Sequence, residues 1–426
     1  MRFKLYQLKR SIKRTLKFWA LSSYKYILEK DSSLSKGLVI LTKIYPFNRY
    51  FVLHKIDYTS NLKTYSSLGV DSNSHNYSYI DIDTQKQVKK PKILKMVGYA
   101  ILENARVITG SEFVFKGGIA YKQDYDFPYK LKDVNYALFH GGIVNNSSYL
   151  LSWKLYHFSK TIDKAIYLSG SYTKNWYHWM IEILPKLIVL KRDLEDFNDF
   201  QILVSKDVIE SANHKSALLC FVEENKIISL DKEQIYRVNA LIYVDSPCIA
   251  TPIKKTHILS SAKDCNFYYS LMKDFKDHLT AELLNSQYTK GSKRIYLYRE
   301  QVSRKFNQKE VLNLLERFDF SSVDTGKLSL KQQAELFNDA EIIVGATGAA
   351  WTNLLFCSEN TKAVIFWPDN LGIDSRFPNL ANLSGVDLYS LEFKNPEKDW
   401  VTYMKSEKEA HVNIENLDQL LKRLTL

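Results

Sequence analysis

The stretch NWYHWMIEILPKLIVL, at residues 175–190, predicts a helix with one buried face. Its apolar residues recur every three or four positions, which is typical of a helix packed on a core. His178 and Glu182 stand four residues apart, so their side chains project from successive turns of the other face. Asn175 can cap the first turn, and Pro185 must kink the helix or begin a new segment. The predicted helix therefore has buried apolar side chains on one face and a neighbouring imidazole and carboxylate on the other.

The length and composition predict a globular protein of more than one domain. A chain of 426 residues is too long for one simple core, and its 45% hydrophobic and 25% charged residues are ordinary proportions. No run of about 18 apolar residues and no signal-peptide segment occur, so the sequence predicts a cytoplasmic protein. The four cysteines are widely spaced, which favours reduced, mostly buried thiols over disulfides and gives no zinc motif.

Residues 1–57 are predicted to form a basic, helical N-terminal arm. The first thirty residues carry nine Lys or Arg against a single Glu, a net eight of the twelve excess positive charges. Residues 1–25 can therefore lie on an anionic membrane surface, or they can pack on the protein's own body with a solvated basic face. No recognised nucleic-acid motif accompanies the charge, so no nucleic-acid partner is expected.

The rest of the chain predicts an α/β architecture. Residues 58–93 are rich in Ser, Asn and Lys and are predicted to be a polar linker or loop. Residues 94–284 predict an N-terminal α/β domain with a β-rich start, and residues 285–426 predict a second, C-terminal α/β domain. Two parallel-sheet domains of this kind place a ligand cleft between the C-terminal ends of their strands.

One tripeptide inside the predicted linker, Asp81-Ile82-Asp83, resembles a metal-binding motif. It stands in a polar stretch without an adjacent apolar strand, and such tripeptides are common by chance. No metal site is therefore predicted.

Two features of the C-terminal domain indicate anion binding. The strand EIIVG runs into the small residues of the turn Thr347-Gly348, where a ligand can approach the backbone and the following helix end favours phosphate. Such turns also serve packing alone. The strand RIYLYRE ends in Arg299, which projects from the same sheet edge if both strands belong to one parallel sheet. A guanidinium there can grip a diphosphate, or it can form a surface salt bridge with Glu300 or Glu310.

Three ordered motifs in the chain resemble those of the bacterial branch of glycosyltransferase family 61. They are NWYHWMIEILPKL at 175–187, RIYLYREQVSRKFNQKEVLNLLERFDF at 294–320 and VGATGAAWTNLLFC at 344–357. The resemblance implies a GT-B-like pair of Rossmann-like domains, with the acceptor on the N-terminal side and the donor on the C-terminal side. It also implies inverting transfer of a sugar from a nucleotide-sugar donor, with no obligatory metal or other cofactor.

The resemblance also implies a biological setting, and two rival functions stay open beside it. The implied acceptor is a glycan or lipid-linked glycan in bacterial capsule, lipopolysaccharide or exopolysaccharide synthesis, at the inner face of the cell membrane. A competing interpretation is transfer of a polyol phosphate or another activated group in the same pathway. A third is a non-catalytic sugar-binding scaffold of the assembly complex.

Site roles follow from the resemblance, residue by residue. It implies His178 as the base or an acceptor-binding group, and Glu182 as its orienting partner or the base itself. The other implied contacts are Asn175 and Tyr177 beside the acceptor, Arg299 as the diphosphate clamp, and Thr347, Gly348, Thr352 and Asn353 as the nucleotide cradle. The chain departs from the family pattern at Thr347 and Phe366, where many members have His and Glu.

Overall fold

The computed structural model describes most of the chain beyond the N-terminal arm. The described residues are 51–68, 77–81, 86–90, 97–124, 134, 136, 142–147, 150–154, 156–170, 172–250, 265–284, 293–299, 305–369, 375–397, 402–403 and 406–425. The predicted arm up to residue 50 and most of Asp81-Ile82-Asp83 lie outside them. No helix in the described part of the chain is long and apolar enough to cross a lipid bilayer.

The first of two large sheets has eleven strands within the described residues, in the order β12-β11-β10-β13-β5-β6-β7-β1-β9-β8, with β2 paired to β5. The strands are β1 (Phe51–Tyr58), β2 (Tyr65–Ser67), β5 (Gly98–Ile108), β6 (Val114–Lys116), β7 (Ile119–Lys122), β8 (Ile143–Asn146), β9 (Leu150–Lys154), β10 (His157–Tyr167), β11 (Gln201–Ser205), β12 (Ile227–Leu230) and β13 (Gln234–Val244). Strands β10 to β13 are parallel, whereas β5, β6, β8 and β9 pair antiparallel. The sheet is therefore mixed, as the β-rich start and the later α/β alternation predict.

The second sheet has the order β17-β16-β18-β19-β20-β3-β4. Its strands are β3 (Tyr77–Asp81), β4 (Lys86–Lys90), β16 (Lys293–Leu297), β17 (Ser321–Val323), β18 (Ala340–Ala346), β19 (Lys362–Pro368) and β20 (Asp387–Phe393). Strands β16 to β20 are all parallel. If they are numbered 1 to 5 along the chain, their order across the sheet is 2-1-3-4-5. The strand order reverses between β16 and β18, and a reversal point of this kind opens a crevice at the carboxyl ends of the strands.

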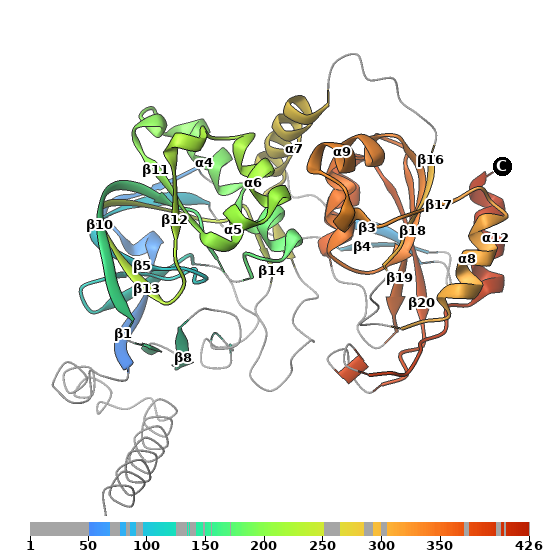
Figure 1. The fold of residues 1–426 in the computed structure, drawn as a ribbon, viewed down its shortest axis with the longest axis horizontal. Coiled ribbons are helices and arrows are strands. Elements are labelled where there is room, and N and C mark those ends of the chain that lie inside the picture. Colours follow the sequence, from blue (N-terminus) through green and yellow to red (C-terminus); the bar gives the residue numbers. More distant parts are fainter. Residues whose placement is uncertain are drawn as a thin grey trace, which may run out of the picture.

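Helices cover both sheets and meet between them (Figure 1). The α-helices are α4 (Lys186–Asp193), α5 (Lys206–Glu210), α6 (Ala212–Leu219), α7 (Tyr269–Leu283), α8 (Gln308–Glu316), α9 (Leu330–Asn338), α10 (Arg376–Ser384) and α12 (Ile414–Thr425). A π-helix, η4 (His178–Ile183), precedes α4, and a 3-10 helix, η8 (Ala349–Phe356), follows β18. Helix α7 contacts α4, α9, α10 and η8, so one buried apolar cluster runs from the first sheet into the second.

Four short 3-10 turns and one strand pair complete the described elements. The turns are η2 (Thr59–Asn61), η5 (Phe197–Asp199), η6 (Glu224–Lys226) and η7 (Thr325–Lys327), and the pair is β14 (Cys248–Ala250) with β15 (Cys265–Phe267).

The α/β class is confirmed, and so is the core stripe of the 175–190 stretch. Its apolar side chains from Trp179 to Ile188 are buried, and α4 starts directly after Pro185, which has no N–H to continue the preceding helix. The helical turns before Pro185 differ from a regular α-helix. The Leu184 N–H donates to the Trp179 carbonyl at 2.8 Å, a bond across five residues that makes this segment a π-helix.

The prediction that residues 58–93 form a linker or loop is wrong where they hold β2, β3 and β4. Strand β3 pairs with β20, so a segment from early in the chain extends the sheet of its C-terminal part (Figure 1). Strand β4, KQVKK, is the edge of that sheet, where lysines are common and few apolar residues are needed. Strand β3 is short and its partner β20 lies far along the chain, so no local pattern reveals this pairing.

Candidate functional site

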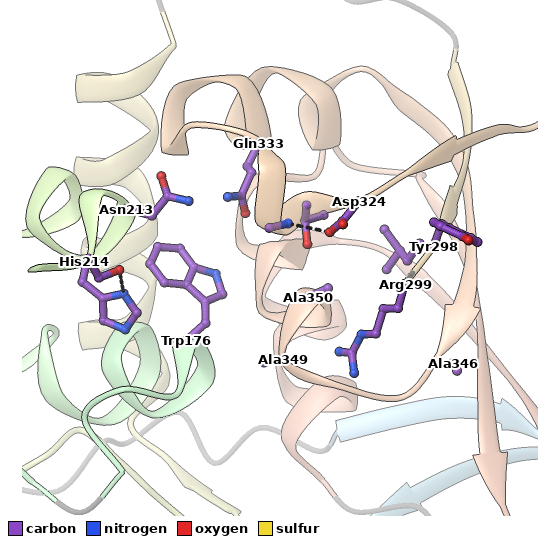
Figure 2. Close-up of a pocket in the computed structure, with 14 residues that line it drawn as sticks. Trp176, Asn213, His214, Tyr298, Arg299, Asp324, Gln333, Ala346, Ala349 and Ala350 are labelled. Atoms are coloured by element: carbon purple, nitrogen blue, oxygen red, sulfur yellow. Dashed lines mark hydrogen bonds between the residues drawn. The ribbon is translucent and has the colours of Figure 1, made fainter. Parts of the chain in front are cut away.

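A cavity of about 500 Å³ lies where the carboxyl ends of β16, β17 and β18 face Trp176, which follows β10, and the start of α6, which follows β11. Figure 2 shows Trp176, Asn213 and His214 on one side of this cavity and Tyr298, Arg299 and Asp324 on the other. The remaining lining residues are Ser211, Leu297, Thr325, Gly326, Gln333, Ala346, Ala349 and Ala350. The cavity therefore sits at the point where the strand order of the second sheet reverses, and its volume is that of a small-molecule site.

Arg299 and Gly348 meet at this point. Strands β16 and β18 pair Leu297 with Gly345, so the residues that follow each strand emerge side by side at the same edge. A Cβ atom at residue 348 would lie 2.9 Å from the guanidinium carbon of Arg299, so the guanidinium rests directly on the glycine. Burial lowers the pKa of Arg299 from its ordinary value. No described residue forms an ion pair with it, and it lines the cavity as a half-buried cation.

A side-chain bridge joins the two walls of the cavity. The Asn353 amide accepts from the indole N–H of Trp176 at 3.1 Å and donates to Gln333 Oε1 at 2.7 Å. Asn353 is fully buried, so it holds Trp176 and Gln333 in place behind the cavity surface.

The other predicted cradle residues lie in the turn before Gly348 or in the buried helix η8. The Thr347 backbone N–H donates to the Phe366 carbonyl at 3.0 Å, which fixes the turn ahead of Gly348. Thr352 is fully buried within η8, and Phe366 is core, edge-on to Phe306. The structure thus brings Gly348 against Arg299, which lines the cavity, while Thr347, Thr352 and Asn353 are buried and do not line it.

His178 and Glu182 form a close pair on the π-helix. His178 Nδ1 and Glu182 Oε2 are 2.6 Å apart, with 17% and 16% of the two side chains exposed. The Ser246 hydroxyl donates to the Glu182 carbonyl at 2.6 Å, which anchors this turn to the end of β13. Neither residue lines the cavity, but Trp176, two positions earlier, does. The pair therefore belongs to the same chain segment as Trp176 but does not line the cavity.

Asn175 and Tyr177 make their contacts within the protein and do not line the cavity. The Asn175 side chain accepts from the Tyr177 N–H at 2.9 Å, the capping bond that the sequence predicts. Tyr177 is buried, its hydroxyl 3.4 Å from the Cys265 sulfur, and its ring packs edge-on against Phe377 of α10. The four cysteines are free thiols, and three of them are buried, as predicted.

A scan against protein-family models matches residues 176–364 to Glycosyltransferase 61. This part of the chain belongs to that family. The matched span begins at Trp176 and ends at Val364, so it includes the His178–Glu182 pair and the lining of the cavity. The family indicates an enzyme of the glycosyltransferase class, which has a sugar donor and an acceptor as its substrates. A search of the curated proteins finds no match.

Sequence reasoning missed one residue beside the glycosyltransferase's candidate catalytic pair. The ring of Tyr172 stacks on His178 with centroids 5.0 Å apart, and 43% of Tyr172 is exposed. Its φ of 59° is uncommon for a bulky side chain and marks strain that the surroundings must hold. No local pattern signals this tyrosine, because a left-handed backbone is usually announced by Gly or Asn.

A buried carboxyl lies close to the same helix. Asp245 accepts hydrogen bonds from the Tyr65 hydroxyl at 2.6 Å, the Gly98 N–H at 3.2 Å and the Thr59 hydroxyl at 3.3 Å. Burial outweighs these bonds and the nearby Lys186 ammonium, and raises the pKa of Asp245 to about 7. The next residue, Ser246, is the one that holds the Glu182 carbonyl. Sequence reasoning missed Asp245 as well, because its partners come from distant strands.

Proposed function

We propose that the chain is an inverting glycosyltransferase with the GT-B arrangement, in which a nucleotide sugar binds the cavity and a glycan acceptor binds beside His178. The observation that carries the proposal is the Arg299 guanidinium. It rests on Gly348 at the reversal point of a parallel sheet, lines a cavity of about 500 Å³ and has no ion-pair partner among the described residues. A half-buried cation at the strand ends, with no ion-pair partner among the described residues, suits a diphosphate.

The proposed reaction uses His178 as the base and Arg299 as the cation beside the leaving group. His178 Nδ1 is engaged with Glu182, which leaves Nε2 to take the proton of the acceptor hydroxyl. The acceptor oxygen then forms its bond to the anomeric carbon as the bond to the diphosphate breaks on the opposite face, so the configuration inverts. Arg299 offsets the charge that grows on the leaving diphosphate, in place of a divalent cation.

The pathway forms part of the proposal. The acceptor is a glycan or lipid-linked glycan in bacterial surface polysaccharide synthesis, and transfer takes place at the inner face of the membrane. The predicted basic arm, residues 1–25, supplies the attraction to anionic lipid. Deletion of residues 1–25 is expected to abolish binding to anionic vesicles while transfer to a soluble acceptor persists.

The test is a panel of nucleotide sugars, scored by nucleotide release with and without a glycan acceptor. Acceptor-dependent release of a nucleoside diphosphate, lost in Arg299→Ala and retained in the exposed control Arg317→Ala, is the expected result. The product's anomeric configuration, read by NMR, reports inversion. Release of a nucleoside monophosphate would indicate polyol-phosphate transfer instead. Retention of configuration, or full activity in Arg299→Ala, would contradict the proposed mechanism.

A further inference from the structure

We propose that the Asp324 carboxylate binds the ribose hydroxyls of the donor, so that the cavity accepts ribonucleoside diphosphates and discriminates against 2′-deoxyribonucleotides. This inference rests on the proposed function and adds to it the class of nucleotide and its direction in the cavity.

The topology places Asp324 at a position suited to this task. Strands β16 and β17 are the first and second strands of the parallel series, and Asp324 directly follows β17. In nucleotide-binding α/β folds the diphosphate sits at the reversal point, and an acidic residue after the second strand accepts hydrogen bonds from the ribose. Here Arg299 lies at the reversal point and Asp324 lies directly after the second strand. Both line the same cavity (Figure 2).

One oxygen of the Asp324 carboxylate is hydrogen-bonded to the protein backbone, and the side chain is partly exposed. One oxygen, Oδ1, accepts from the Gly326 N–H at 3.0 Å, which fixes the side chain against the η7 turn. The other, Oδ2, lies 3.9 Å from the Lys327 ammonium, and 28% of the side chain is exposed. An ionised carboxylate has only acceptor sites, and a ribose diol presents two donors. The acceptor sites of Asp324 that no described residue occupies therefore match the ribose edge of a nucleotide.

An ion pair between Asp324 and Arg299 would be the simplest alternative explanation of the two charges. No such pair is formed, although the Asp324 charge raises the pKa of Arg299 against the larger effect of burial. The two groups thus face the cavity separately, as a ligand with an anionic part and a hydroxyl-bearing part requires.

This assignment gives the donor a direction. In the order β17-β16-β18-β19, ribose lies at β17 and diphosphate between β16 and β18, so the glycosyl group extends toward β19. Helix α10 follows β19, and its Phe377 packs against Tyr177, the neighbour of His178. The transferred sugar is thereby directed to the side of the candidate base.

The experiment measures binding to the full chain by calorimetry, with UDP, GDP and ADP each paired with its 2′-deoxy counterpart. We expect the ribonucleotide to bind at least roughly tenfold tighter, the value of a charge-assisted hydrogen bond. Asp324→Ala should abolish this preference by weakening only the ribonucleotide, and Asp324→Asn should reduce it. Asp387→Ala is the control, because Asp387 is exposed at the opposite, amino end of β20.

The outcomes separate the two proposals. If nucleotides bind but wild type does not distinguish ribose from deoxyribose, the inference fails and the proposed function stands. Equal weakening of both nucleotides in Asp324→Ala gives Asp324 a structural role only and also refutes the inference. If no nucleotide binds wild type, both proposals fail. Discrimination by wild type can be measured even if a variant does not fold.

Discussion

Replacement of Gly348 by alanine tests whether Arg299 works through its close contact with the turn. The added Cβ would lie 2.9 Å from the guanidinium carbon and 3.1 Å from Nη1, inside the 3.4 Å at which ordinary contacts begin. The far end of the arginine side chain must therefore move, by roughly 1 Å for the closest nitrogen, and a shift of that size can cost about 100-fold in rate. Loss of a hydrogen bond to a charged group costs about 1.5–3 kcal/mol, so we expect diphosphate affinity to fall roughly 10- to 100-fold.

The assay is a double-mutant cycle with Arg299→Ala, read by calorimetric binding of the preferred nucleoside diphosphate. If Gly348→Ala acts by displacing the guanidinium, it should add little once Arg299 is already alanine, so the two effects should not sum. Thermal unfolding of each variant checks that the fold persists. Full additivity of the two losses, or an unchanged affinity in Gly348→Ala, would refute the idea that the glycine serves the arginine.

Three further predictions concern the catalytic segment and its support. His178→Ala should lower kcat roughly 10²- to 10⁴-fold, the usual contribution of a general base, and leave diphosphate affinity unchanged, as steady-state transfer and calorimetry would report. Asn353→Ala should lower the free energy of unfolding by about 1–3 kcal/mol in denaturant titration, because buried Gln333 loses a partner along with Trp176. Since the folded-state pKa of Asp245 is raised to about 7 from 3.8, wild type should lose stability relative to Asp245→Asn as pH rises from about 4 to about 7. That loss is at most about 4 kcal/mol, and denaturant titrations across this range would measure it.

The sequence predicts what is encoded locally. The parallel strands, the buried stripe before Pro185 and the shared edge of Arg299 and Gly348 all follow from short apolar runs and small-residue turns, and the structure has each of them. The domain boundaries at 93/94 and 284/285 stay a prediction. The membrane-binding arm also stays a prediction, since it lies outside the described residues.

Local patterns fail where a residue's role depends on a distant partner. Strand β3 is only five residues long and pairs with β20, far along the chain. Local patterns do not distinguish Tyr172 or Asp324, because an exposed tyrosine and an acidic turn residue are ordinary in isolation. Their meaning comes from the stacked ring of His178 in one case and from the position after the second parallel strand in the other.

Asn353 belongs to a family motif, but its contacts lie within the protein. Its place in the third motif implies a contact with the nucleotide, yet its fully buried amide is hydrogen-bonded to Trp176 on one side and Gln333 on the other. Trp176 opens the matched family region and belongs to the first motif, so two of the three motifs meet through one hydrogen bond between the walls of the cavity. The motifs therefore meet where the two walls of the cavity join, and Arg299, between them in sequence, lines the cavity without an ion-pair partner among the described residues.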